Sequence, residues 1–411
     1  MILIKKKLSN VRQYKYLGFI VTPSGEITTG LKDLRIRALK AITKIRKSLG
    51  QFFHQNVWNT MYLYNYMVMP ILLYTSDFWG CLKHPTDSPL ERLHRHFYKQ
   101  VLGVKKQTST CAVHLETGTV PIIFRAVKSS IKNWERIREG SCNILLAAAF
   151  QEATGTNLPW IRSIRQMFET NGLLNIYQSP DMEVTEESKL PHNLLFQRLT
   201  DQFQQSASSE VADSTKLSFY SQFKTNHKME RYLSDVTNVK HRKALTKLRM
   251  SSHQLAIEEG RYTETPREMR TCSLCKAGVE DEAHFLIQCP AYNNIRHHMS
   301  EYNSILMCET DSIAERATKL MTSRDLKPVA KFVYEAFEHR KNMIESIFTL
   351  NDILDKIDKQ ETVSAKIQAD VERTLNNIIT KVSKKSHKIP EKTYIIKNSS
   401  ADGMRFTISL Q

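Results

Sequence analysis

The clearest pattern along the chain is a stripe of apolar side chains between residues 31 and 49. Apolar residues recur there at steps of three and four, with lysine or arginine at most positions between them. This spacing predicts an amphipathic helix with a strongly basic outer face, and Gly50 favours an end to the helix. The face is either a solvated surface or a surface for phosphate contacts. The stripe consists of Leu31, Leu34, Ala38, Ile42, Ile45 and Leu49.

Other stretches carry the same helical spacing. Residues 56–79 are apolar and aromatic nearly all round, which predicts a buried helix that Pro70 kinks or breaks. Its methionines and tyrosines are assigned to the core rather than to a stacking platform. From Ser88 to Gly103, apolar residues line one side of a second helix and basic residues the other. Helical periodicity continues within residues 120–175.

The C-terminal part is also helical in pattern. Ser312 and Glu315 have the spacing of a capping box, and Pro328 suits the first turn of the next helix. Helical spacing returns between residues 367 and 382. Two stretches predict loops or linkers instead: residues 178–190 are polar and acidic, and residues 204–214 are rich in Ser, Gln and Ala.

A short β-hairpin is predicted near the N-terminus. Residues 14–22 are rich in aromatic and β-branched side chains and run into Pro23-Ser-Gly-Glu26, a Pro/Gly turn signal. Beyond this hairpin the patterns indicate a mainly α fold.

The composition of the chain indicates which class of partner it binds. The chain has 411 residues, with 59 Lys plus Arg against 42 Asp plus Glu and a net charge of +17. This balance points to a polyanion, RNA and/or DNA. The longest apolar run, from Met67 to Tyr74, is too short to cross a bilayer, so no membrane contact is expected. The first residues lack a secretory pattern, and we expect an intracellular protein, in the nucleus and/or cytoplasm.

The cysteines carry the strongest chemical signal. Cys272, Cys275, His284 and Cys289 have the spacing C-x2-C-x8-H-x4-C, and thiolate and imidazole are the ligands that tetrahedral zinc prefers. Four protein ligands leave no open position, so one structural Zn²⁺ is predicted. The alternative is a chance cluster of reduced cysteines beside a core histidine. Four other cysteines lie far apart and are predicted to be buried small hydrophobic residues: Cys81, Cys111, Cys142 and Cys308.

Within this motif, the acidic residues Glu280, Asp281 and Glu282 are predicted to form a solvated turn that contributes no ligand. Signatures of catalysis are missing from the whole chain. The sequence contains no G-x4-G-K-[ST], H-E-x-x-H or G-x-S-x-G motif and no adjacent pair of aspartates to hold catalytic magnesium. We therefore expect no enzymatic activity from this chain on its own.

Several stretches together resemble one family. Residues 14–18 with the turn after them, residues 93–103, and residues 115–118 with Pro121 occur in the order found there. The more specific stretch is R-M-S-S-H-Q-L-A-I-E-E-G-R-Y at residues 249–262, which precedes the Cys/His motif. Over roughly residues 11–345, the chain resembles the C-terminal part (thumb, linker and CCHC zinc knuckle) of a non-LTR (LINE-type) retrotransposon endonuclease/reverse transcriptase.

The resemblance implies an order of regions along the chain. These are residues 1–30 as a β-hairpin resembling a primer grip, 31–105 as thumb-like helices, 106–265 as a helical linker region with loops near 178–214, 266–300 as the zinc knuckle, 301–385 as C-terminal helices and 386–411 as a flexible tail. In this family a palm with paired aspartates carries out polymerisation. The resemblance therefore implies a segment that binds nucleic acid without polymerising.

It also implies two sets of contacts. The helix at 31–49 would face a template or primer backbone through Lys32, Arg35, Lys40, Lys44 and Lys47. The knuckle would grip element RNA or target DNA through Arg261, Arg267, Arg270 and Arg296. Three aromatic residues could stack on unpaired bases, although packing in the knuckle core is the favoured role for each: Tyr262, Phe285 and Tyr292.

Three hypotheses for function remain. The first is a reverse-transcriptase segment that binds nucleic acid and lacks catalysis. The second is a host-adapted zinc-knuckle protein that serves as a nucleic-acid or protein-binding scaffold, with a protein partner on helices 312–382. The third, an enzyme of unrecognised type, is the least favoured because no catalytic site can be named.

Overall fold

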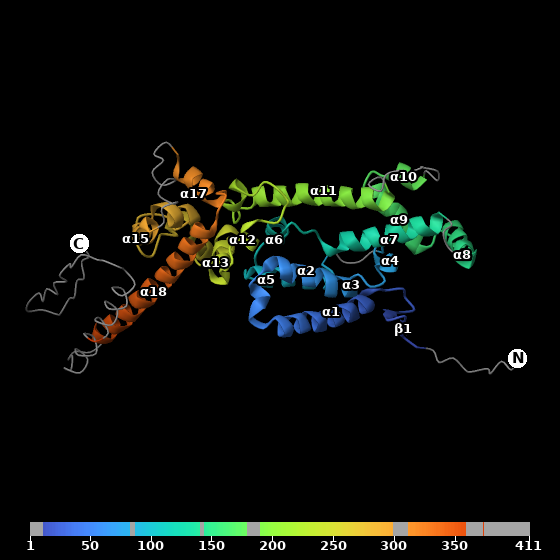
Figure 1. Ribbon diagram of the computed structural model, residues 1–411, viewed down its shortest axis with the longest axis horizontal. Coiled ribbons are helices and arrows are strands. Elements are labelled where there is room, and N and C mark those ends of the chain that lie inside the picture. Colours follow the sequence, from blue (N-terminus) through green and yellow to red (C-terminus); the bar gives the residue numbers. More distant parts are fainter. Residues whose placement is uncertain are drawn as a thin grey trace, which may run out of the picture.

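The computed structural model describes residues 11–82, 87–139, 144–178, 190–298, 311–358 and 373, with side chains described only to residue 346 in the long helix that reaches residue 358. Within these ranges the fold is mainly helical with one two-stranded hairpin, as predicted (Figure 1). The predicted periodicity at 367–382, the tail at 386–411, most of the linker at 178–190, and Cys142 and Cys308 lie outside the described residues.

The hairpin is present, but its turn is not where the sequence pattern placed it. Strand β1 (Tyr14–Tyr16) pairs antiparallel with β2 (Phe19–Val21) across Leu17 and Gly18, which have φ of 44° and 86°. Two consecutive positive φ values are the requirement of the tight turn that matches the twist of a hairpin. The turn signal at Pro23–Glu26 was expected to form the hairpin, and this was wrong, because that segment joins β2 to the first helix.

The first helices confirm one prediction and correct another. Helix α1 (Thr28–Leu49) ends at Gly50 as expected. The helix predicted over 56–79 is divided next to Pro70, as expected, and a second time after Leu72, which was not expected. Its parts are α2 (Val57–Met67), α3 (Met69–Leu72), with Pro70 in its first turn, and α4 (Ser76–Trp79). A short 3-10 turn, η1 (Gly50–His54), joins α1 to α2, and helix α5 (Pro89–Leu102) follows, capped by Ser88.

Burial on all sides of this segment was also a wrong expectation. The side chains of Trp58, Tyr62 and Tyr66, four residues apart on α2, are 58%, 50% and 65% exposed. Tyr64 and Met61 on the opposite side are buried. Only one face of α2 packs on the core, so its apolar sequence leaves an aromatic ridge in solvent.

The middle of the chain forms a second helical layer. Its helices are α6 (Thr110–Thr117), α7 (Ile122–Arg138), α8 (Ile144–Gly155), α9 (Pro159–Thr170), α10 (Leu174–Gln178) and α11 (Pro191–Asp213). Helix α11 lies along α7 and α6 (Figure 1). The loop predicted at 204–214 was wrong, because this segment is the C-terminal half of α11. Ala207 and Val211, one turn apart, are buried and hold it on the core.

The last part surrounds the Cys/His motif. It contains 3-10 turns η3 (Tyr220–Gln222), η4 (Arg267–Met269) and η6 (Pro290–Tyr292), a π turn η5 (His284–Gln288), and the helices α12 (Tyr232–Asp235), α13 (Val239–Arg249), α14 (Ala256–Tyr262), α15 (Asn293–His297), α17 (Ile313–Met321) and α18 (Lys327–Asp358). The capping box at Ser312 and Glu315 is confirmed. Helix α18 packs on α13 and extends obliquely from one end of the molecule (Figure 1).

One apolar core connects these regions. It runs from Phe19 in the hairpin through α1, α5 and α13 to the Cys/His motif and Ala336 in α18, so it is continuous across the boundaries expected at 105 and 265. A smaller cluster between α7, α9 and α11 includes Cys81, whose burial was predicted; the same prediction was wrong for Cys111, which is only partly buried. Among the described residues, no helix is long and apolar enough to cross a membrane.

Candidate metal centre

The first two candidate ligands lie on a tight backbone loop. Thr271 and Val279 form an antiparallel bridge, and the amide of Cys272 donates to the carbonyl of Gly278 at 2.8 Å. Inside this loop the amide of Lys276 donates to the carbonyl of Cys272 at 3.0 Å, and Lys276 adopts a left-handed φ of 58°. The turn directs the side chains of Cys272 and Cys275 toward the same point.

The other two ligands stand at the ends of the π turn η5. The carboxylate of Asp281 accepts a hydrogen bond from the amide of His284 at 2.9 Å and so caps the start of the turn. The amide of Cys289 donates to the carbonyl of His284 at 2.9 Å and closes the turn. The wider π turn thus brings a histidine and a cysteine five residues apart to one side.

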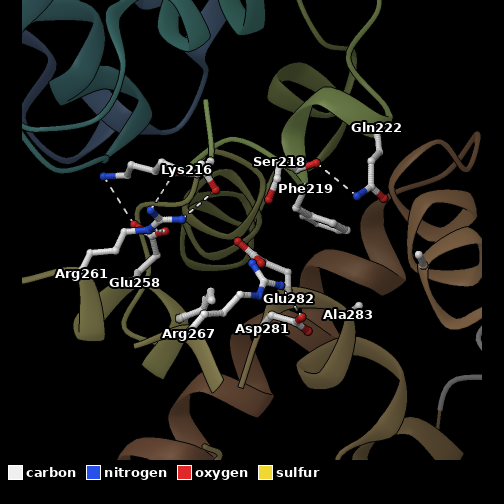
Figure 2. Close-up of a pocket in the computed structure, with 13 residues that line it drawn as sticks. Lys216, Ser218, Phe219, Gln222, Glu258, Arg261, Arg267, Asp281, Glu282 and Ala283 are labelled. Atoms are coloured by element: carbon white, nitrogen blue, oxygen red, sulfur yellow. Dashed lines mark hydrogen bonds and ion pairs between the residues drawn. The ribbon is translucent and has the colours of Figure 1, made fainter. Parts of the chain in front are cut away.

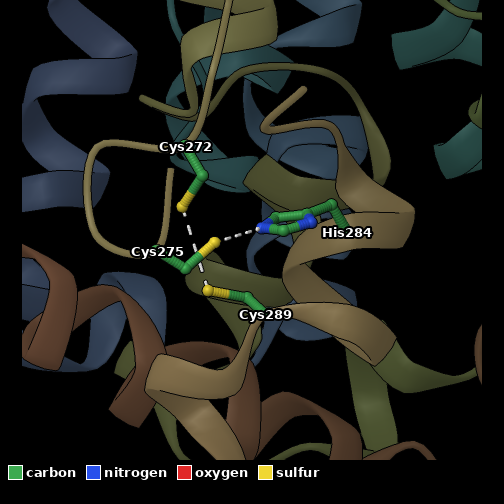
Figure 3. A group of neighbouring side chains, drawn as sticks. All are labelled: Cys272, Cys275, His284 and Cys289. Atoms are coloured by element: carbon green, nitrogen blue, oxygen red, sulfur yellow. Dashed lines mark hydrogen bonds between the residues drawn. The ribbon is translucent and has the colours of Figure 1, made fainter. Parts of the chain in front are cut away.

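The four side chains converge (Figure 3). The sulfur atoms of Cys272 and Cys289 are 3.8 Å apart, and the sulfur of Cys275 lies 3.3 Å from Nε2 of His284. All four potential ligand atoms lie within 4.8 Å of one another. Cys272, Cys289 and His284 are buried, and Cys275 is partly exposed. The structure therefore brings together the four residues predicted from the spacing, and they could hold one metal ion.

The thiols of the cluster share their protons unequally. The hydrogen bond with Cys289 lowers the pKa of Cys272 to about 3, against the opposing effect of burial. The same hydrogen bond raises the pKa of Cys289. A thiolate beside a protonated thiol can bind a cation, and the thiol releases its proton as the cation binds.

The acidic residues inside the motif are not a solvated turn, and that prediction was wrong. Glu280 is fully buried, and its two carboxylate oxygens accept hydrogen bonds from Arg340 of α18, both at 2.7 Å. Glu282 is 6% exposed and accepts a hydrogen bond from Nε2 of His253 at 3.0 Å. These carboxylates fasten the metal loop to α18 and to the segment before α14, because each has a buried partner from outside the loop.

Two of the four arginines predicted to grip nucleic acid are committed to the fold instead. Arg296 is 2% exposed and donates to the carbonyls of Leu286 at 2.9 Å and Phe285 at 3.3 Å. Arg270 is partly buried and donates to the carbonyls of Thr265 and Ile257. The predicted contact was wrong for Arg296, which is buried. For Arg270 it stays a prediction, although two of its donor groups already bond carbonyls.

The other two arginines are more accessible. Arg261 donates to Glu258 at 2.8 Å and to the carbonyl of Thr215 at 2.7 Å. Arg267 is exposed and approaches Asp281 only at 3.4 Å. Both line a cavity of about 210 Å³ next to the metal loop, together with Lys216 (Figure 2). This cavity was not predicted, because it combines residues from four separated segments, namely 215–222, 257–267, 281–283 and Ala314.

The stretch at 249–262 proves to be a junction between regions. Arg249 is 1% exposed and donates to Glu116 of α6 at 2.8 Å, to Glu230 at 2.9 Å and to the carbonyl of Met321 of α17 at 3.0 Å. Gly260 leaves room for the side chain of Arg270, since an added Cβ would lie 2.6 Å from its Cγ. The stretch therefore positions the metal loop against the helical layers.

The aromatic candidates divide in the same way. Phe285 and Tyr292 are 0% and 1% exposed and pack edge to face in the core, which confirms the favoured interpretation. For Tyr262 the favoured packing role was wrong, because its ring is 59% exposed at the end of α14, where the ammonium of Lys105 lies 6.0 Å from the ring centre. Only this ring of the three remains available to a ligand.

The five basic residues predicted on α1 stay in solvent. Lys32, Arg35, Lys40, Lys44 and Lys47 are all exposed.

Comparisons of the whole chain with protein-family models, with curated proteins and with solved structures give no match. The functional interpretation therefore depends on the residues of this chain and their surroundings.

Proposed function

We propose that this protein binds RNA or DNA through its basic helical surface, as the non-catalytic C-terminal part of a non-LTR retrotransposon reverse transcriptase, and that one structural Zn²⁺ folds its Cys/His loop. The proposal assigns binding and positioning to this chain, and polymerisation to a palm domain with paired aspartates. The resemblance of residues 11–345 supports the origin. The surface of α1 supports the binding.

The observation that carries the proposal is the unpaired charge on α1. Asp33 is the single acidic residue of this helix, and it forms an ion pair with Arg37 at 3.0 Å. The other exposed cations on the helix make no ion pair or hydrogen bond to a described residue. They are Lys32, Arg35, Lys40, Lys44 and Lys47. Binding of such a face to a phosphate backbone is favourable because the lysines and arginines release the counterions condensed on the nucleic acid.

The donor set and its geometry fit zinc. With Zn–S bonds of about 2.3 Å, tetrahedral coordination places two sulfur atoms about 3.8 Å apart. The sulfur atoms of Cys272 and Cys289 are separated by 3.8 Å. Three thiolates and one imidazole would coordinate Zn²⁺, with release of the thiol protons, and the ion would link the loop at 272–275 to the π turn. The ion would supply folding free energy rather than catalysis.

The proposal is tested by titrating binding against salt. Replacing Lys40, Lys44 and Lys47 with Gln should weaken binding of labelled RNA and DNA of any sequence by roughly tenfold or more. The slope of log K against log salt should become shallower by about 2 to 3, near 0.7–0.9 per lost phosphate contact. Fluorescence anisotropy between low and physiological salt measures both.

The control removes the same charge elsewhere. Lys319, Lys331 and Lys341 lie on α17 and α18 and each pairs with an acidic residue, so their replacement with Gln should leave the slope unchanged. Equal losses from both triple variants would show that net charge alone matters. A loss confined to one sequence would contradict a backbone role for α1.

A second candidate is a scaffold that binds another protein, and the ridge of Trp58, Tyr62 and Tyr66 on α2 favours it. Exposed aromatic residues are enriched at protein interfaces. A wild-type protein that shows no salt-dependent nucleic-acid binding would favour this candidate over the first.

A further inference from the structure

A second set of cations continues from α1 toward the metal loop. Arg46, on the side of α1 that faces α5, donates to the side-chain oxygen of Gln100, and the amide nitrogen of Gln100 lies 2.7 Å from Nε2 of His96. Further along, the ammonium of Lys99 donates to the carbonyl of Lys106 at 2.8 Å. Contacts among these residues thus place cations of α1, α5 and the following loop side by side.

The charges in this set repel one another. After burial, the largest effects on His96 come from Arg46, Lys106 and Lys99, and all of them lower its pKa. The pKa of Lys99 is lowered by its burial and then by Arg95 and Lys216. Among the described residues, the carbonyl of Lys106 is the hydrogen-bond partner of Lys99, and no carboxylate pairs with it. A partly buried cation among cations destabilises the folded chain until an anion compensates it.

The set reaches the rim of the cavity beside the metal loop. Lys105 donates to the carbonyl of His253 at 2.8 Å and lies 6.0 Å from the ring centre of Tyr262. Lys216 forms an ion pair with Glu258 at 3.5 Å and lines the cavity together with Arg261 (Figure 2). The cations therefore extend from α1 over α5 to α14.

We propose that these residues form a track for one strand of nucleic acid, which places an unpaired base on Tyr262. The track consists of Arg46, His96, Lys99, Lys105, Lys106 and Lys216. It rests on the proposed function and names the ligand as single-stranded. Consecutive phosphates would lie along these side chains and compensate the charge of Lys99, which pairs with no carboxylate among the described residues.

Tyr262 is what distinguishes a single strand from a duplex. Its ring is 59% exposed, and a cation stands beside it. An aromatic ring at the side of a cationic surface stacks on a base only when that base is unpaired. A duplex would still contact the lysines through its backbone, but its bases would not reach the ring.

The experiment compares binding of a labelled 20-nucleotide single-stranded RNA with binding of the same strand in a duplex. We expect Lys99→Gln/Lys106→Gln to weaken single-strand binding about tenfold and to flatten the salt dependence by about 1 to 1.5. We expect Tyr262→Ala to weaken it about five- to hundredfold while duplex binding stays unchanged. Tyr262→Phe should retain wild-type affinity, because the ring is kept.

Matched variants keep the test specific. Lys106→Glu changes an exposed side chain alone, preserves the carbonyl that Lys99 contacts, and should show the loss even if the double variant folds poorly. Lys331→Gln/Lys341→Gln on α18 removes equal charge and should bind as wild type. If the α1 triple variant loses binding while the track variants do not, the track is wrong and the proposed function stands. If the wild type binds neither probe, both proposals fail.

Discussion

On α1, five exposed lysine and arginine side chains make no ion pair or hydrogen bond to a described residue, whereas Arg249, Arg270 and Arg296 around the metal loop donate hydrogen bonds to buried acceptors. The sequence alone does not distinguish the two sets, because both consist of lysine or arginine residues in a basic chain. Their surroundings separate them: α1 offers one carboxylate, while the loop offers free carbonyls and buried glutamates. The available acceptors therefore decide the role of each cation: those of the second set stabilise the fold, and those of α1 stay accessible to a ligand.

The largest expected effect concerns the metal that would organise the second region. Cys275→Ser should abolish stoichiometric zinc binding and unfold residues 270–296 locally, because metal binding and folding of the loop form one equilibrium. Elemental analysis and hydrogen exchange measure the two effects. Arg270 and Arg296 would then lose their carbonyl acceptors, while α1 should stay protected.

Cys111→Ser provides the control, since Cys111 lies on α6 and contacts Glu210 rather than the cluster. Unchanged zinc content in Cys275→Ser would contradict the metal assignment. Loss of protection in α1 as well would show that the two regions fold as one unit and would weaken the contrast between them.

The next effect tests a buried arginine directly. Arg249→Met should lower the free energy of unfolding by about 3–5 kcal/mol, because Glu116 is left as a buried charge without its partner. Lys247→Met, on the same helix but exposed, should change it by less than about 0.5 kcal/mol. Urea unfolding at neutral pH, followed by circular dichroism, measures both variants.

The stability difference between wild type and Arg249→Met should depend on pH. Burial alone would raise the pKa of Glu116, but the charge and hydrogen bond of Arg249 outweigh it and leave the pKa below its ordinary value of 4.5. The lowered pKa means that the contribution is complete above 4.5 and is lost as the pH falls through the folded value. The difference between wild type and Arg249→Met should therefore shrink in acid. A difference that grows below pH 4.5 would contradict the ion pair.

The sequence predicted what local spacing determines. The helix of α1 follows from apolar steps of three and four, and the metal ligands follow from short intervals that a turn can close. It failed where the partner is distant: Glu280 meets Arg340 across 60 residues and Glu282 meets His253 across 29. No local pattern distinguishes such buried carboxylates from a solvated turn.

Prediction from the sequence also failed where the composition of a segment and its packing disagree. The Ser/Gln/Ala-rich half of α11 resembles a loop in composition, yet it buries Ala207 and Val211 in the core. On α2 the apolar composition suggested burial on every side, yet neighbours cover one face alone and Trp58 remains exposed. Period and composition report what a segment can bury, whereas the neighbouring helices decide what it does bury.

The smallest effect compares two arginines of the same motif. Arg296→Met removes hydrogen bonds to the carbonyls of Leu286 and Phe285 and leaves these acceptors buried, which should cost about 1–3 kcal/mol of unfolding free energy. Arg267→Met removes one exposed contact to Asp281 and should cost less than about 0.5 kcal/mol. Nucleic-acid affinity should show the opposite order, because only Arg267 is accessible to a phosphate. Equal stability losses, or a larger affinity loss from Arg296→Met in protein that remains folded, would remove the distinction between cations that hold the fold and cations that serve a ligand.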